Sequence, residues 1–420
     1  MINEINGLLI VGLATICGLA AGLLMNKIKL PAVTGYVLIG VILGESICGV
    51  FTPQMIEQTG VINGLALGFI AFSIGEELEF RFLRQLGKSI FLISIFEAMG
   101  AFILVTAAMY LVIHELHLAL VLGAVASATA PAATMMVLRE TRAKGILTST
   151  LMAVVAIDDA MALILYGFAS SLAKVMMLPG NSIALSTIII NPLIEIFGAL
   201  FLGILSGLLL GFFAKKMSDQ SELLILVVGT LVLNTGLAQF FHFSELLSNM
   251  ALGTAVCNFA PGITRRIFKL TSNITPPIYV MFFVLAGARL QLDLVKVIGV
   301  IGIVYTVVRI IGKVGGAALG GIVSSAPTPV RRYLGLGLLS QIGVAIGLAI
   351  MIQHEFPAST YGEAGEKMGL WVVNILLFTT IITEFIGPIL TKYAVTKAGE
   401  VKIDDQRKDG SFLTPTEVES

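Results

Sequence analysis

Two adjacent aspartates in an apolar stretch are the residues whose types and spacing most directly suggest chemistry. Asp158 and Asp159 lie in the segment AVVAIDDAMALILYGF. Successive residues of a helix point about 100° apart, so one carboxylate can face a cavity while the other faces a neighbouring helix. Two carboxylates this close repel each other when both are ionised, which favours the uptake of a proton by one of them. Their oxygens also suit a small hard cation; a purely structural acid pair is the alternative.

Three further charged residues lie in other apolar stretches. Lys313 occurs in RIIGKVGGAALGG, and because an ammonium in lipid needs a counter-charge, we expect it to pair with Asp158. The alternative is that its side chain extends to the membrane surface. Glu97 and Arg309 occupy equivalent positions of an internal repeat, and we expect them to form a structural ion pair.

Two apolar segments contain signals for interrupted helices. In ASATAPAAT, Pro131 removes a helical hydrogen-bond donor and frees a carbonyl one turn earlier. Irregular backbone at membrane depth is tolerated where it lines a cavity, so freed carbonyls, Ser127 and the Thr129 hydroxyl could coordinate a cation; a proline kink without a ligand is the alternative. The opposite break is expected in SQIGVAIG, at Gln341 and Gly343. The predicted sodium ligands are Asp159, Asp158 and Thr129.

The composition is that of an integral membrane protein. The 420 residues are 57% hydrophobic and 12% charged, whereas a soluble domain carries about 25% charged residues. The formal net charge is zero, which gives no sign of a nucleic-acid partner. The three cysteines are scattered, so they form neither a disulfide framework nor a metal-ligand set.

Thirteen apolar segments could cross the bilayer, since each approaches the roughly 20 residues that a spanning helix needs. Most Lys and Arg residues fall on one side if the N-terminus is outside and the C-terminus is cytoplasmic, as in a protein of the inner or plasma membrane. At the inner end of one span, we expect Glu76, Glu77 and Glu79 to form interfacial salt bridges with Arg81 and Arg84; a funnel for ions is the alternative. The candidate spans are 7–25, 31–49, 61–80, 89–112, 118–138, 148–170, 187–213, 222–241, 244–260, 276–292, 297–323, 333–352 and 368–391.

Short matches at an offset of about 212 residues indicate an internal repeat. The matched glycines are Gly40 with Gly253, Gly75 with Gly287, and Gly100 with Gly312. Six spans lie in each copy, and an odd number of spans precedes the second copy, so the copies are inverted, an arrangement typical of transporters with crossed, broken helices at the site. The expected division is a membrane domain over 1–393, with repeats at 7–170 and 222–391, a linker helix at 187–213, and a polar cytoplasmic tail at 394–420.

The chain resembles the monovalent cation:proton antiporter-2 family over about residues 5–395. LPAVTGYVLIGVILG is similar to the opening helix motif of that family, IDDA to its paired-aspartate motif, RIIGK to its lysine helix and SATAP to its broken helix. The resemblance implies a homodimer in which a core domain moves like an elevator against a dimerisation domain. It also implies that Asp159 is the main ion-binding and proton-carrying carboxylate, with Asp158 paired to Lys313.

The expected function is secondary active antiport of Na⁺ or Li⁺ for protons by alternating access, with no cofactor and no enzymatic reaction. Electrogenic exchange is expected, because ATAP has Ala130 where electroneutral relatives often carry Asp. A Lys313 that loses its proton when Na⁺ binds would also add a second proton to each cycle. Glu76, in GEELEF, stands where a Leu is usual.

Other functions fit the sequence less well. Potassium-efflux relatives usually replace the first aspartate by Gln and carry a C-terminal nucleotide-binding domain. The sequence has neither feature, so K⁺/H⁺ antiport ranks second. An organic-anion transporter on the same scaffold ranks below it, since fold does not determine function. An intramembrane aspartyl protease needs its two aspartates on different helices, whereas here they are adjacent.

Overall fold

The computed structural model describes residues 7–401, apart from residues 29, 53–54, 57–58 and 178–184. The described residues form helices and no strand beyond one isolated bridge. Most of the predicted polar tail lies outside the described residues. The helices are α1 (Gly7–Lys27), α2 (Ala32–Leu43), α4 (Gly60–Glu77), α5 (Phe80–Ile113), α6 (Leu116–Ala126), α7 (Pro131–Glu140), α8 (Ile146–Met177), α9 (Leu185–Ala214), α10 (Gln220–Phe240), α11 (Glu245–Phe259), α12 (Pro261–Gly287), α13 (Leu292–Val323), α14 (Thr328–Tyr333), the 3₁₀ helix η2 (Leu334–Leu338), α15 (Gly343–Glu355) and α16 (Ala358–Lys397).

The all-helical membrane fold is confirmed, but the count of thirteen spans is not. Ten helical segments among the described residues are long and apolar enough to cross a membrane, or eleven if the bent pair from Thr328 to Glu355 is one span. The other two predicted spans contain α2, with 12 residues, and α11, with 15. At about 1.5 Å per residue, both are shorter than the roughly 30 Å hydrocarbon core. Helix α12 also begins at Pro261, well before the predicted start at 276.

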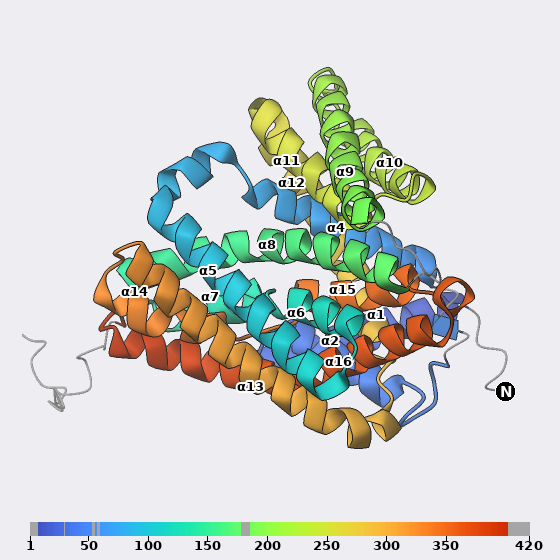
Figure 1. Ribbon diagram of the computed structural model, residues 1–420. Helices are drawn as coiled ribbons and strands as arrows, with labels where there is room; N and C mark the ends of the chain where they lie inside the picture. The colour runs from blue at the N-terminus through green and yellow to red at the C-terminus, as the bar shows by residue number, and fades with distance from the viewer. Residues whose placement is uncertain (1–6, 29, 53–54, 57–58, 178–184, 402–420) are drawn as a thin grey trace, which may run out of the picture.

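The helices form two groups that meet around α8. Figure 1 shows α9, α10, α11 and α12 together on one side, with α5, α8, α13 and α16 on the other. Helix α5 packs along α13 and against α6 and α8, whereas α11 packs against α4 and α9. Helix α8 contacts both α6 in its own group and α4 and α9 in the other, so the aspartate pair is carried by a helix between the two groups.

Close glycine contacts connect segments that the repeat offset relates. A Cβ added at Gly40 would lie 2.1 Å from the Val284 carbonyl oxygen, next to Gly287. The repeat-equivalent contact joins α4 to α11, where Cβ at Gly75 would lie 2.8 Å from the Cα of Gly253. Small residues let helix backbones approach closely, which is how helices associate where lipid offers no hydrophobic driving force.

We expect the Gly40→Ala substitution to destabilise the protein, because the methyl group would collide with backbone that cannot move independently. Overpacking of this kind costs about 1–3 kcal/mol. The apparent Tm of the detergent-solubilised protein measures the effect. Gly236→Ala is the matched control, since a Cβ there has no atom within 4 Å; an equal loss of Tm in both variants would count against the close packing of α2 on α12.

Two interrupted helices touch each other at their breaks. The first break separates α6 from α7 at residues 127–130, and the second separates η2 from α15 at residues 339–342, with a 47° bend. The backbone N–H of Ala130 donates to the Ser340 carbonyl at 2.8 Å, and the Thr134 hydroxyl donates to the Gly337 carbonyl at 2.8 Å. Pro131 begins α7 and Gly343 begins α15, so both predicted breaks are confirmed.

Candidate functional site

The paired aspartates lie near the middle of α8 and are buried, with exposed fractions of 0% for Asp158 and 5% for Asp159. The start of α8 is held by Glu400, whose carboxylate accepts hydrogen bonds of 2.7 Å from the backbone N–H groups of Leu147 and Thr148. A carboxylate at a helix N-terminus satisfies donors that have no helical partner and opposes the helix dipole favourably. The chain just after α16 therefore positions the aspartate helix.

Lys313 pairs with Asp158, as the sequence predicted. The Lys313 Nζ donates to Asp158 Oδ2 at 2.7 Å, from α13 to α8. Both side chains are 0% exposed, so the alternative in which the lysine extends to the membrane surface is wrong. A buried ion pair of this kind is strongly destabilised when one partner is removed, because the remaining charge has no water around it.

Lys313 has more partners than its charge pair. Its Nζ also contacts a carboxylate oxygen of Glu97 on α5, the Thr129 hydroxyl at 2.6 Å and the Ser127 carbonyl. Glu97 is 0% exposed. The three ammonium protons have acceptors in Asp158, Thr129 and Ser127. Glu97 lies in ion-pair contact with the same Nζ, but both of its oxygens are buried without a hydrogen bond among the described atoms.

The predicted ion pair between Glu97 and Arg309 is wrong. Arg309 instead donates to the carbonyls of Ala126 at 2.9 Å, Ala128 at 2.7 Å and Leu339 at 2.6 Å. These carbonyls lie at the breaks of both interrupted helices, where helical partners are missing and lipid supplies none. The rigid fork of guanidinium donors matches several carbonyls at once, and Glu97 turns to Lys313.

The freed carbonyls of the first break are satisfied by protein side chains rather than left open. Gln341 donates its amide to the Val125 carbonyl at 2.8 Å, in addition to the contacts of Arg309 and Lys313. The expectation that these carbonyls are available to a cation is therefore wrong for this arrangement of the helices. Gln341 therefore connects the two breaks. The sequence placed Gln341 in the second break, but it did not define this connecting role.

The hydroxyls of the first break are also engaged. Thr129 donates to the Leu338 carbonyl at 3.3 Å while it accepts from Lys313, and Ser127 donates to the Ala124 carbonyl at 2.6 Å. Thr129 nevertheless lies beside the aspartates, because its backbone N–H hydrogen-bonds to Asp159. Cation binding by these two hydroxyls stays a prediction, and it requires their present contacts to change.

Asp159 faces a further carboxylate that the sequence analysis assigned elsewhere. Glu77, in the last turn of α4, is close enough to interact electrostatically with Asp159. Among the described atoms, Asp159 Oδ1 and Glu77 Oε2 are buried and accept no hydrogen bond. Glu77 and Arg81 form no ion pair among the described residues. The Arg84 side chain lies outside the described residues, so the salt bridges predicted with it stay a prediction. In the sequence, the unusual acidic run GEELEF was the feature that could have pointed to a carboxylate near the aspartate pair.

The site is closed toward one end of α8. Leu163, four residues after Asp159, packs with Leu67 of α4, Leu246 of α11 and Val344 of α15 around a cavity of only ≈10 Å³. Beyond this apolar layer a wide cavity of ≈640 Å³ opens between α8, α9, α11 and α15. Along α8, this apolar layer therefore lies between the wide cavity and the aspartate pair.

A charged cluster lines the wide cavity and was not predicted. Lys174 of α8 bridges Glu195 of α9 at 2.8 Å and Glu355 of α15 at 3.4 Å. Tyr166 donates to Glu355 at 2.9 Å, and Ser171 donates to Glu195 at 2.7 Å. The cluster joins both helix groups at one end of the molecule. The cluster was missed because its residues lie near the ends of predicted spans, where isolated charged residues are common.

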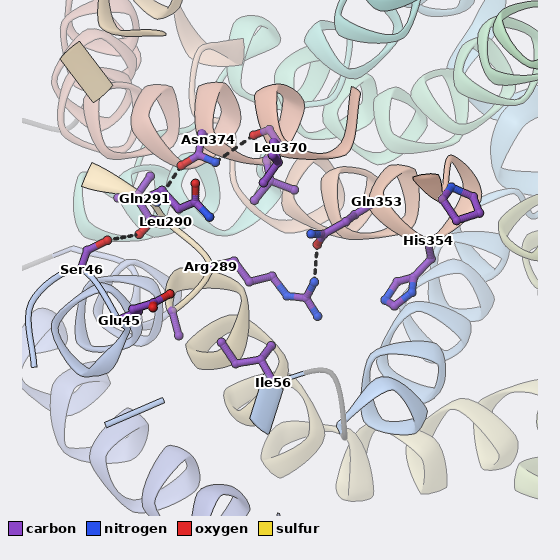
Figure 2. A pocket seen from close by; sticks show the side chains of 13 residues that line it. Glu45, Ser46, Ile56, Arg289, Leu290, Gln291, Gln353, His354, Leu370 and Asn374 are labelled. Atoms are coloured by element: carbon purple, nitrogen blue, oxygen red, sulfur yellow. Dashed lines mark hydrogen bonds between the residues drawn. The ribbon is translucent and has the colours of Figure 1, made fainter. Parts of the chain in front are cut away.

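A second cavity, of ≈420 Å³, lies near the same end. Figure 2 shows Arg289 and Gln353 pointing toward each other across it, with His354 on the same helix as Gln353. Ser46 donates to the Leu290 carbonyl at 2.8 Å, and Asn374 accepts from the Gln291 backbone at 2.7 Å, so polar contacts tie the loop after α12 to α16. No aspartate of the pair lines this cavity, so it is separate from the candidate site.

The site combines a buried aspartate pair, a lysine bound to one of the aspartates, and two crossed helix breaks. Comparison with known families decides which class of protein carries this site. The family described as "Sodium/hydrogen exchanger, transmembrane" matches residues 11–397. The chain belongs to this family. The exchanger is therefore a cation/proton antiporter by family, a transporter rather than an enzyme, and a multi-pass membrane protein.

Individual relatives are distant but nearly full-length. The exchanger is 22% identical over 393 residues to the ammonium/H⁺ antiporter subunit AmhT of Alkalihalophilus pseudofirmus, which covers 92% of this chain and 95% of the relative. Its structure is similar to that of the sodium proton antiporter MjNhaP1 from Methanocaldococcus jannaschii at pH 8, with a TM-score of 0.75, 18% identity and coverage of 92% and 97%. At this identity the structural likeness shows the fold alone.

Proposed function

We propose that this exchanger moves Na⁺ or Li⁺ against protons by alternating access, with Asp159 as the carboxylate that binds either the cation or the proton. The observation that carries the proposal is the asymmetry of the aspartate pair. The Oδ1 atoms of both aspartates lack a hydrogen-bond partner among the described residues, but Asp158 is ion-paired through Oδ2 with Lys313, whereas no described cation forms an ion pair with Asp159. A carboxylate without an ion-pair partner can exchange a proton for a hard cation, since both bind the same oxygens.

Neighbouring groups support a cation site at Asp159. Glu77 of α4 offers a second carboxylate oxygen without a hydrogen-bond partner among the described atoms. Na⁺ at Asp159, Asp158 and Thr129, with Ser127 nearby, remains our proposed ligand set.

Ammonium is the second candidate cation, because the distant curated relative is described as a subunit of an ammonium/H⁺ antiporter. K⁺, the runner-up in the sequence analysis, remains a further alternative. Na⁺, Li⁺, NH₄⁺ and K⁺ each carry one charge, so the aspartate pair does not distinguish them by charge alone. The cations differ in size and in the free-energy cost of dehydration. Transport measurements compare the exchange rates of the cations directly.

The subfamily, the membrane location and the oligomeric state are proposed from the sequence. We propose that the exchanger belongs to the antiporter-2 branch and lies in the plasma or inner membrane with a cytoplasmic C-terminus. We also propose that it works as a homodimer whose site-bearing helices α5–α8, α13, α15 and α16 move against the other group. The apolar layer around Leu163 supports such a movement, since it closes the path from one end.

Transport by the purified protein in liposomes tests the proposed function. Na⁺ and Li⁺ pulses should drive protons across the membrane, as reported by an entrapped pH dye, at rates well above those for equal pulses of K⁺ or NH₄⁺. Protein-free liposomes correct for ammonia leak. A larger response to NH₄⁺ or K⁺ than to Na⁺ would instead support the second candidates, and no response to any of the four would refute cation/proton exchange at this site.

A further inference from the structure

A charged contact fastens the aspartate helix to its neighbour at the end of the molecule that holds the wide cavity. Glu195 of α9 uses both carboxylate oxygens on α8: Oε1 accepts from Lys174 Nζ at 2.8 Å, and Oε2 accepts from the Ser171 hydroxyl at 2.7 Å. Ser171 is 2% exposed, and the side chains of Lys174 and Glu195 are 23% and 12% exposed. The three residues form a mostly buried two-point contact, which we call the latch.

The latch crosses the boundary between the two helix groups. Helix α8 belongs to the site group, which comprises α5–α8, α13, α15 and α16, whereas α9 belongs to the second group with α4 and α10–α12. The described ion pairs of Lys313 and Glu115 instead lie within the site group. Lys174 also pairs with Glu355 of α15, in its own group, at 3.4 Å. Glu195 is thus the carboxylate that the second group contributes.

Helix α9 is fixed to its own group, because its glycines lie against the backbone of α11. A Cβ added at Gly203 would lie 2.1 Å from the Ser248 carbonyl oxygen. Helix α11 is joined in the same way to α4, where a Cβ at Gly75 would lie 2.3 Å from the Met250 carbonyl oxygen. Such close backbone contacts leave little room for sliding. Helices α4, α9 and α11 therefore form one body, and Glu195 is part of it.

Helix α8 meets this body through side chains rather than backbone. A Cβ added at Gly167 would lie 2.5 Å from the Leu247 side chain of α11. The apolar layer around Leu163 likewise contains side chains from both groups. Contacts of this kind can separate without deforming a helix, so opening the layer means moving α8 away from α4, α9 and α11. The latch lies on the same helix, about two to three turns beyond Leu163.

We propose that the contact of Glu195 with Lys174 and Ser171 is a conformational latch, which holds this end of the exchanger closed and breaks in each transport cycle. The inference rests on the proposed function, because alternating access requires the site group to move against the second group. Hydrogen bonds of 2.7 and 2.8 Å are lost when the partners separate by about 1 Å. A movement that opens the apolar layer therefore breaks the latch first.

Breaking the latch leaves no buried charge alone. Lys174 keeps Glu355, its partner in the site group. Glu195 lines the wide cavity of ≈640 Å³, where water can solvate its carboxylate. Opening therefore costs less than breaking a fully buried pair, in which the remaining charge has no substitute partner. The latch can stabilise the closed arrangement and still open within a cycle.

A reversible cross-link tests whether the latch opens. Ser171→Cys and Glu195→Cys are combined in the full-length protein after its native cysteines, Cys17, Cys48 and Cys257, are replaced by alanine. A short bifunctional methanethiosulfonate joins the new pair and fixes α8 to α9. Na⁺-driven pH change in liposomes should then fall to the level of protein-free liposomes. Dithiothreitol should restore it, because it cleaves the disulfides of the cross-link.

Glu115→Cys with Lys367→Cys is the matched control, since these residues form an ion pair at 2.5 Å within the site group. The same reagent should leave its exchange rate unchanged. A cross-linked pair at positions 171 and 195 that exchanges at the rate of the reduced protein overturns the inference, because the latch then stays closed through the cycle. A pair that the reagent does not join overturns it as well, since α8 and α9 then do not meet at the latch.

Glu195→Gln measures how strongly the latch holds this end closed, since it removes the ion pair and keeps the shape of the side chain. Leu246→Cys, in the same cysteine-free protein, reports exposure of the apolar layer to a charged thiol reagent in lipid nanodiscs. Glu195→Gln should speed labelling about tenfold, because a partly buried pair contributes more than an exposed one. Glu115→Gln should leave the labelling rate unchanged. Equal rates with and without Glu195 would contradict the latch.

The wild type separates the inference from the proposed function. If Na⁺, Li⁺, K⁺ and NH₄⁺ all leave the internal pH of wild-type liposomes unchanged, the proposed function is refuted, and the latch with it. If the wild type exchanges and the cross-linked protein exchanges equally well, the latch alone is overturned. The labelling measurement needs no transport, so it tests the closed end even in a variant that exchanges slowly.

Discussion

Asparagine at position 159 should reduce cation-driven proton movement to the level of protein-free liposomes. The substitution keeps the size of the side chain and removes both its negative charge and its titratable proton. In the wild type, Asp159 is 5% exposed and its Oδ1 has no hydrogen-bond partner among the described residues, so no existing contact is lost at that oxygen. The protein should therefore fold and bind detergent as the wild type does, while exchange is abolished.

The liposome assay with an entrapped pH dye measures this loss of cation-driven proton movement. Asp293→Asn is the matched control, because Asp293 is an exposed aspartate in the first turn of α13, away from the pair. It should exchange at the wild-type rate. Normal exchange by Asp159→Asn would refute the assignment of Asp159 as the carrier and would direct attention to Glu77.

Glutamine at position 309 should cause the largest loss of stability among single substitutions of the site. Arg309 satisfies carbonyls at both helix breaks, and it is fully buried. A glutamine side chain is shorter and cannot reach all three carbonyls from the same backbone position. Each buried acceptor left without a donor costs about 1–3 kcal/mol, so two of them cost roughly 2–6 kcal/mol.

The apparent Tm in detergent measures this change, and Arg266→Gln is the matched control. Arg266 also donates to two backbone carbonyls, those of Met217 and Ser218, but these lie near the exposed turn between α9 and α10. Water can replace its hydrogen bonds, so the control should lose far less stability. Equal losses in the two variants would mean that Arg309 does not hold the crossed breaks together.

The sequence was sufficient for features that depend on a single helix. The cost of a charge in lipid pointed to Asp158, Asp159 and Lys313 without any knowledge of packing. Pro131 and Gly343 marked the two breaks because backbone chemistry is local. The matched glycines indicated the internal repeat. The structure adds that such glycines lie at close helix contacts, since a Cβ at Gly100 would lie 2.7 Å from the Gly312 carbonyl oxygen.

Helix lengths were predicted less well, because hydropathy does not record where a helix begins inside a bundle. Helices α2 and α11 are short, yet their neighbours bury them through glycine contacts with α12 and α4. Helix α12 continues through Pro276 and Pro277, which in sequence favour a boundary at that point. Packing against neighbouring helices overrides such local signals.

Only the tertiary structure decided the partners of Glu97, Arg309 and Glu77. The repeat offset placed Glu97 and Arg309 at equivalent positions, but equivalence does not define the direction in which a side chain points. Arg309 turned to unsatisfied carbonyls, because no water is present to satisfy them. Glu97 turned to Lys313, and Glu77 approached Asp159 from another helix. These contacts join residues far apart in the chain, and they depend on helix rotation, which the sequence of one helix does not determine.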